Sequence, residues 1–270
     1  MKIANYVYIC LFLFSANAAV FAQVVPLRQA HAHNDYEHPR PLLDALDAGF
    51  GSVEADIFLV DGKLLVGHTP FSLKPERTLQ KLYLDPLTQR AKLNHGKIYK
   101  ELDTFYLMID IKTDAAKTYA ALAKVLEGYS EQITTIVKGK VSIKAITVIL
   151  SGNRDVKTIR TQERRLVAID GRPDDLDDPQ SRELIPWVSA RWGSMFRWNG
   201  TGPIPEDQLK QLNEYVTKAH EQGRMVRFWA IPDPPTAWKT LLDAKVDLIN
   251  TDKLTELSDF LRKRSEKSEK

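Results

Sequence analysis

Apolar runs of β-forming residues alternate along the chain with segments that repeat at helical spacing. Eight of these runs have the length and composition of strands: residues 28–33, 52–59, 105–112, 145–150, 165–169, 187–191, 225–231 and 247–250. Strands that alternate with helices form parallel sheets with crossover helices. Eight such units are the number that a (β/α)8 TIM barrel requires, so the pattern predicts a single-domain α/β fold of this kind.

The connections between these runs carry recognisable end signals. Three helical patterns are each closed by a glycine: residues 41–48 by Gly49, 115–126 by Gly128 and 206–222 by Gly223. Many helices end in a left-handed residue, and glycine adopts that conformation freely, so all three glycines are expected to be left-handed. Asp61-Gly62 predicts a tight hairpin that extends the second strand. Residues 69–100 are long and polar, which predicts an active-site excursion with short helices.

The first 22 residues differ from the rest of the chain. Lys2 precedes an apolar run that ends in small residues, with Val20 and Ala22 where a signal peptidase would need them. The run is too short to span a membrane, and the pattern is typical of a signal peptide, although an uncleaved anchor is an alternative. We therefore expect an exported protein, periplasmic or secreted, with no transmembrane segment after cleavage. Its barrel would occupy residues 23–262, followed by a charged tail at 263–270.

Composition and charge exclude several classes of protein. Cys10 is the sole cysteine and lies in the predicted signal peptide, so disulfides and thiol chemistry are not expected in the mature chain. The formal net charge is +3, or +2 without Lys2, and charges of both signs are interspersed outside the tail. Nothing in this distribution indicates a nucleic-acid partner. The oligomeric state is left open.

Carboxylates are concentrated at the ends of two predicted strands. Glu54 and Asp56 are two residues apart on one strand, so both point to the same face. Asp110 and Lys112 repeat this spacing on the next strand, and the active sites of TIM barrels lie at such strand ends. Three converging carboxylates predict an oxygen-only site for a divalent cation, Mg²⁺ or Ca²⁺. The alternative is that the acids are surface residues of an edge strand.

Two histidines follow strand ends beside these acids. His33 ends the first strand, and His68 follows the hairpin. Such a pair can divide acid and base catalysis, one ring taking a proton from the nucleophile and the other giving one to the leaving oxygen. Lys112 would neutralise charge that develops on a phosphoryl group. A purely structural role is the alternative, and it is favoured for His31 and His38.

At these residues the chain resembles the phospholipase C-like phosphodiesterase superfamily, and within it an uncharacterised subgroup of the glycerophosphodiester phosphodiesterases. The motifs that carry the resemblance follow one another along the chain: Ala32-His33-Asn34, Ala45-Leu46-Asp47-Ala48-Gly49, Glu54-Ala55-Asp56, Gly67-His68, Asp110-Ile111-Lys112, Phe228-Trp229-Ala230-Ile231 and Ile249-Asn250-Thr251-Asp252. The resemblance implies metal-assisted attack on a small-molecule or lipid-derived phosphodiester, through a cyclic phosphate if the substrate has a neighbouring hydroxyl.

Three positions depart from the family pattern. Thr69 replaces the usual Asp after the second histidine, and Asn34 replaces the commoner Arg. Asp110 replaces a Glu, as in the sphingomyelinase D branch. The resemblance therefore supports the catalytic machinery better than it supports any one substrate.

The substrate-binding candidates are Asn34, Arg191 and Trp229. An arginine can bind a phosphate, and a Trp can bind the face of a sugar or polyol. For both residues, packing at the barrel rim is an equally supported alternative. Besides a sphingomyelinase D-like phospholipase, two other functions are possible. His31-x-His33 is also typical of metal-dependent amidohydrolases and phosphoesterases, which need more histidines at strand ends. A binding module without catalysis is the other.

Overall fold

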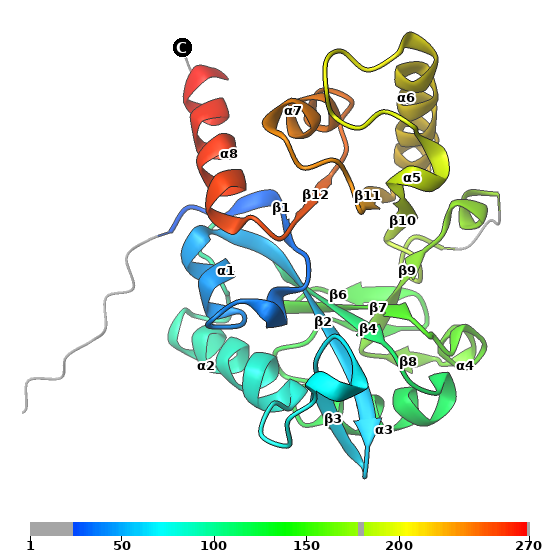
Figure 1. Ribbon diagram of the computed structural model, residues 1–270. Coiled ribbons are helices and arrows are strands. Elements are labelled where there is room, and N and C mark those ends of the chain that lie inside the picture. The colour runs from blue at the N-terminus through cyan, green and yellow to red at the C-terminus, as the bar shows by residue number, and fades with distance from the viewer. Residues whose placement is uncertain (1–23, 178–180, 269–270) are drawn as a thin grey trace, which may run out of the picture.

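The computed structural model describes residues 24–177 and 181–268, which form a closed barrel of eight parallel strands (Figure 1). The barrel strands are β1 (Leu27–Ala32), β2 (Phe50–Val60), β4 (Phe105–Ile111), β7 (Ile146–Gly152), β9 (Val167–Gly171), β10 (Trp187–Arg191), β11 (Met225–Trp229) and β12 (Leu248–Thr251). The sheet closes because β1 pairs with both β12 and β2. The predicted α/β TIM barrel is confirmed, and every strand lies within two residues of its predicted bounds.

Helices follow most of the barrel strands. They are α1 (Leu43–Ala48), α2 (Asp85–Leu93), α3 (Ala115–Glu127), α4 (Val156–Thr161), α5 (Trp192–Met195), α6 (Glu206–Glu221), α7 (Pro235–Asp243) and α8 (Leu254–Ser268), with short helices η1 (Asp35–Glu37), η2 (Pro70–Ser72), η3 (Gln80–Leu84) and η4 (Pro173–Leu176). The predicted hairpin is present, since Asp61 and Gly62 have positive φ and join β2 to antiparallel β3 (Lys63–Val66). A separate small sheet contains β5 (Thr135–Val137), β6 (Lys140–Ser142) and β8 (Arg164–Arg165).

Alternate residues of each strand build two cores. Inward-facing Met108, Ile149, Trp187 and Leu248 form a cluster that fills the barrel. Val53, Ala55 and their counterparts on the other strands belong to a second, larger cluster with the helices. This is the alternation that a strand dictates. The barrel is therefore a packed core, and the polar residues further along the same inward rows lie at its C-terminal end.

One of the three glycine predictions is wrong. Gly49 and Gly223 have φ of 90° and 69°, the left-handed conformation expected of them. Gly128 is right-handed, with φ of −65°. After α3 the chain continues in tight turns, in which the amides of Gly128 and Tyr129 donate to the carbonyls of Val125 and Leu126. No left-handed residue is needed there, because these turns satisfy carbonyls at the helix end.

One further segment differs from prediction. Residues 80–93 form η3 and α2, which bury Tyr83, Leu84 and Leu87 in the outer core, so this segment mostly covers the barrel instead of forming an active-site excursion. α8 extends to Ser268, so the charged tail continues a helix, as expected of a helix end. The predicted signal peptide lies outside the described residues. In the described ranges, no helix is both long and apolar enough to cross a membrane.

Candidate active site

A cavity of about 530 Å³ opens at the C-terminal ends of the barrel strands. All nine residues predicted for the site line it: His33, Asn34, Glu54, Asp56, His68, Asp110, Lys112, Arg191 and Trp229. These residues come from segments that are up to about 200 positions apart in sequence, and the closed sheet brings them together. The nine residues therefore form one site, and the role of each stays a prediction.

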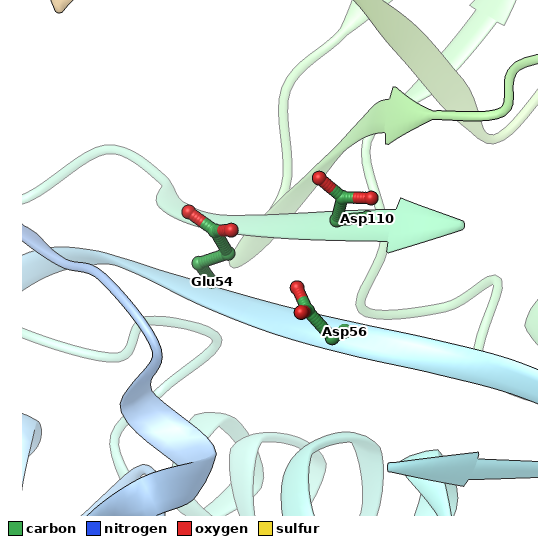
Figure 2. Close-up of side chains that lie close together, drawn as sticks. All are labelled: Glu54, Asp56 and Asp110. Atoms are coloured by element: carbon green, nitrogen blue, oxygen red, sulfur yellow. The ribbon is translucent and has the colours of Figure 1, made fainter. Parts of the chain in front are cut away.

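The three acids converge as their strand positions require. Asp56 of β2 and Asp110 of β4 are partners in the parallel register, and Glu54 lies one inward position earlier on β2. Figure 2 shows the three carboxylates pointing toward one another above these strands. One oxygen from each lies within 4.8 Å of the others. Glu54 and Asp56 are almost completely buried, so water does little to screen their mutual repulsion.

Two cations offset part of this negative charge. Arg227 Nη2 lies 2.7 Å from Glu54 Oε2. Burial raises the pKa of Glu54, but the Arg227 charge together with the contacts to His31 and His33 outweighs burial and lowers that pKa to about 2. Lys112 Nζ lies 3.0 Å from Asp56 Oδ2 and 3.1 Å from Asp110 Oδ1. Burial and the Glu54 charge still raise the pKa of Asp56 to about 7. Three carboxylates thus share two cations, and one negative charge is left over.

The donor set fits a hard divalent cation. Asp56 Oδ1 is buried and has no hydrogen-bond partner among the described residues. Arg227 contacts Oε2 of Glu54, so Oε1 of the same carboxylate remains for a cation. Oxygen ligands of this kind suit Mg²⁺ or Ca²⁺. The excess negative charge and the unpaired oxygen are both what a cation site needs.

His33 is held by an acid from the other end of the chain. Its Nδ1 lies 2.9 Å from Asp252 Oδ1, and we assign that nitrogen as the donor because the acceptor is a carboxylate. Burial lowers the pKa of His33, but the hydrogen bond to Asp252 and the negative charges of Glu54 and Asp252 together outweigh burial and raise it. Nε2 is then the ring nitrogen available for reaction. Asn34 lies beside this pair, with its amide nitrogen 2.9 Å from the same ring nitrogen.

His68 is linked to the acid cluster through a tyrosine that the sequence analysis missed. Tyr36 Oη lies 2.7 Å from Asp56 Oδ2 and 3.0 Å from His68 Nδ1. A phenol has one proton, and the carboxylate is the stronger acceptor, so His68 Nδ1 donates to the Tyr36 oxygen. This leaves Nε2 of His68 free to accept a proton. Tyr36 follows the Asn34 motif in η1, but nothing in the sequence links it to β2.

His31 lies below the cavity and does not line it. Its ring is completely buried, with Nδ1 2.7 Å from Ser52 Oγ and Nε2 3.6 Å from Glu54 Oε2. Burial and the Arg227 charge lower its pKa to about 4, so the ring is neutral. His220 pairs with Asp247, the residue before β12, and therefore lies at the N-terminal end of the barrel. These positions disfavour a metal centre built on His31-x-His33.

A second polar cluster extends the site along β7 and β9. Ser151 Oγ donates to Asp170 Oδ2 at 2.7 Å, and Arg172 Nη1 donates to the same oxygen at 2.7 Å. The sequence analysis did not single out Ser151 or Asp170. Asp170 ends the apolar run before Gly171, the same signal that identified Asp110, so it could have been found. The partnership of Arg227 with Glu54 could not, because 173 positions separate the two residues.

Gly152 provides the space in which Asp110 lies. Its φ is +67°, and a Cβ at this position would lie 2.1 Å from Asp110 Oδ1 and 2.5 Å from the carbonyl oxygen of Ile111. We expect Gly152→Ala to displace the Asp110 carboxylate and to cost about 1–2 kcal/mol for the left-handed backbone alone. Cation affinity, measured by calorimetry, should fall at least about tenfold, which corresponds to about 1.4 kcal/mol.

Gly139→Ala is the matched control for this substitution. Gly139 also has a positive φ, +79°, but a Cβ there would meet nothing within 4 Å. The control should therefore show the backbone cost without the loss of cation affinity. Equal cation affinity in the two variants would contradict the role assigned to Gly152.

Comparison with known proteins identifies the family. The sequence model of the AIM6-like phosphodiesterase domain matches residues 18–170, and that of the glycerophosphoryl diester phosphodiesterase family matches residues 225–255. Altered inheritance of mitochondria protein 6 of Eremothecium gossypii is 31% identical over 91% of this chain and 72% of its own. The Saccharomyces cerevisiae protein of that name is 33% identical over 91% of this chain and 73% of its own.

A solved structure supports the fold. The crystal structure of a glycerophosphodiester phosphodiesterase from Parabacteroides distasonis matches with a TM-score of 0.52 and 17% sequence identity, over 88% of this chain and 98% of that one. The resemblance inferred from the motifs is thus confirmed at the level of family and fold.

The comparisons overturn one prediction and settle the classification. The predicted export to the periplasm or medium is wrong, because the matched relatives are yeast proteins named for altered inheritance of mitochondria. By contrast, the matches to both family models cover the strands that carry His33, Glu54, Asp56, Asp110 and Trp229. The chain belongs to the AIM6-like phosphodiesterase domain family.

Proposed function

We propose that the chain is a metal-assisted phosphodiester hydrolase. In this proposal Glu54, Asp56 and Asp110 hold Mg²⁺ or Ca²⁺, and the substrate is a small-molecule or lipid-derived phosphodiester. The observation that carries the proposal is the convergence of three carboxylates, two histidines and a lysine in one cavity at the C-terminal end of the barrel. The phosphodiesterase fold and family support the same reaction class.

The chain's own groups would position the phosphodiester and stabilise its charge. A bound cation supplies positive charge that polarises the phosphoryl group. Lys112 Nζ lies at the edge of the acid cluster and is partly exposed to the cavity, so it can donate to a phosphoryl oxygen. The attraction between the Lys112 ammonium and that oxygen would strengthen as negative charge develops in the transition state. Asn34 lies beside His33 and can donate to another substrate oxygen.

The two histidines would move the protons. The contact with Asp252 raises the pKa of His33 and favours its protonated form, which suits it to protonate the leaving oxygen. His68, with Nδ1 donating to Tyr36, can take a proton at Nε2 from the attacking group. That group is a water molecule or a neighbouring hydroxyl of the substrate. In the second case the leaving alcohol departs as a cyclic phosphate forms, and water then opens this intermediate to the monoester.

Chelation tests the cation requirement directly. We expect EDTA to abolish hydrolysis of bis-(p-nitrophenyl) phosphate by the purified protein and added Mg²⁺ or Ca²⁺ to restore it. Glu54→Gln and Asp56→Asn should weaken cation binding and lower the rate, while Asp103→Asn, a change at an exposed acid outside the cavity, should not. Full activity in excess EDTA would contradict the proposal. A protein that binds the cation but hydrolyses no diester would be a binding module instead.

A further inference from the structure

The wall of the cavity opposite the acid cluster carries an arginine without an acidic partner. Arg191 ends β10, which lies four strands from β2 in either direction around the closed sheet. Its guanidinium lies over the ring of Trp229, with Cζ 5.7 Å from the ring centroid. Both side chains line the cavity and are exposed to it. The stacking fixes a positive charge on the far side of the site from Asp56.

The other basic residues of the cavity wall are already engaged. Each is paired with carboxylates: Arg227 with Glu54, Lys112 with Asp56 and Asp110, and Arg172 with Asp170. Arg191 differs, because none of the carboxylates in the described ranges lies within ion-pair distance of it. Its charge is thus available to a ligand.

The charge balance of the cavity shows what kind of ligand would use it. Four carboxylates and four cationic side chains line the wall, so their formal charges cancel. A divalent cation would add two positive charges, and a phosphodiester would bring one negative charge. One positive charge would then remain, and among the described residues Arg191 is the lining cation that has no carboxylate partner.

We propose that Arg191 binds a second anionic group of the substrate, so that the preferred diesters carry a carboxylate or phosphate on the head group. This inference rests on the proposed function and narrows its substrate class. A guanidinium fork can form two parallel hydrogen bonds to either anion. The same residue disfavours choline-like head groups, because it covers a Trp face that could otherwise attract a quaternary ammonium.

Two matched pairs of glycerophosphodiesters test the proposal. Glycerophosphoserine differs from glycerophosphoethanolamine by one carboxylate, and glycerophosphoinositol 4-phosphate differs from glycerophosphoinositol by one phosphate. We expect the anionic member of at least one pair to bind about tenfold more tightly, as a charge-assisted hydrogen-bonded pair allows. Binding is measured by calorimetry with Mg²⁺ in the His33→Ala protein, where turnover during the titration is slowest. Whichever pair shows the preference identifies the anion.

Arg191 variants decide whether that preference arises at this site. Arg191→Gln should bring the ratio close to one, and Arg191→Lys should keep part of it, because the charge remains without the fork. Lys210→Gln makes the same change in net charge on α6, outside the cavity, and should keep the full ratio. Equal binding within both pairs, or a preference that survives Arg191→Gln, would overturn the proposal. A preference that depends on Arg191 in a protein that hydrolyses none of the four ligands would support the subsite and reject the proposed function.

Discussion

Replacing His33 with alanine is expected to lower kcat for phosphodiester hydrolysis by roughly 10²–10⁴-fold, the usual contribution of general acid–base catalysis. The physical reason is the hydrogen bond from His33 Nδ1 to Asp252. This bond favours the protonated ring and turns the opposite nitrogen, Nε2, away from Asp252. Stability should change little, since the ring lies at a strand end in an open cavity. The measurement is steady-state turnover of bis-(p-nitrophenyl) phosphate, with unfolding curves of the same preparation.

His68→Ala should cause a loss of similar size, and the double variant should lose much less than the product of the two, because both groups act in one mechanism. The pH–rate profile should be bell-shaped for the unmodified protein. His33→Ala should lose the alkaline limb, where the acid deprotonates, and His68→Ala should lose the acidic limb.

His31→Ala is the matched control for both histidine variants. It removes a fully buried histidine that packs against Trp187 and does not line the cavity. It should therefore lower stability more than it lowers rate. A near-normal rate for His33→Ala together with an inactive His31→Ala would contradict the assignment.

Arg227→Ala is expected to lower the free energy of unfolding by about 3–5 kcal/mol, because it leaves the buried Glu54 carboxylate without its counter-charge. Arg227 also donates to Asn250 and lies within the barrel, so the loss includes a packing contribution. The measurement is denaturant unfolding in EDTA, so that no cation substitutes for the guanidinium. Added Mg²⁺ should then recover part of the loss, since a ligand that binds the native state stabilises it.

Arg264→Ala is the control for the buried pair. Arg264 lies 2.7 Å from Asp243, as close as Arg227 lies to Glu54, but both partners are more than two-fifths exposed. An exposed pair of this kind contributes at most about 1 kcal/mol. Similar losses in the two variants would show that the buried position of Glu54 has little energetic consequence.

The sequence was sufficient for the barrel and for the acid cluster, for a physical reason. Both depend on short-range periodicity, because alternation along β2 and β4 decides that Glu54, Asp56 and Asp110 point inward. The strand ends that carry His33 and His68 follow from the same pattern. This prediction needs only the pattern within each strand, because the closed sheet then brings the strand ends together.

The partners of these groups could not be predicted from the sequence. Arg227 reaches Glu54 across the barrel, and Tyr36 reaches Asp56 from the short helix η1, so each contact depends on three-dimensional positions that no spacing encodes. The conformation of Gly128 could not be predicted from its position after the helix either, because it depends on the turns that follow α3. The export prediction relied only on an apolar run near the start of the chain and the small residues that follow it, and the relatives of the chain overturned it.

Phosphorus NMR of a glycerophosphodiester incubated with the purified protein and Mg²⁺ tests the central claim most directly. The diester signal should disappear as a monoester signal appears, with a cyclic phosphate as intermediate if a neighbouring hydroxyl attacks. The conversion should stop in EDTA and in an Asp56→Asn/Asp110→Asn variant that retains the fold by circular dichroism. An unchanged diester signal with Mg²⁺ and Ca²⁺ across the four head groups above, or equal conversion by the double variant, would contradict the account.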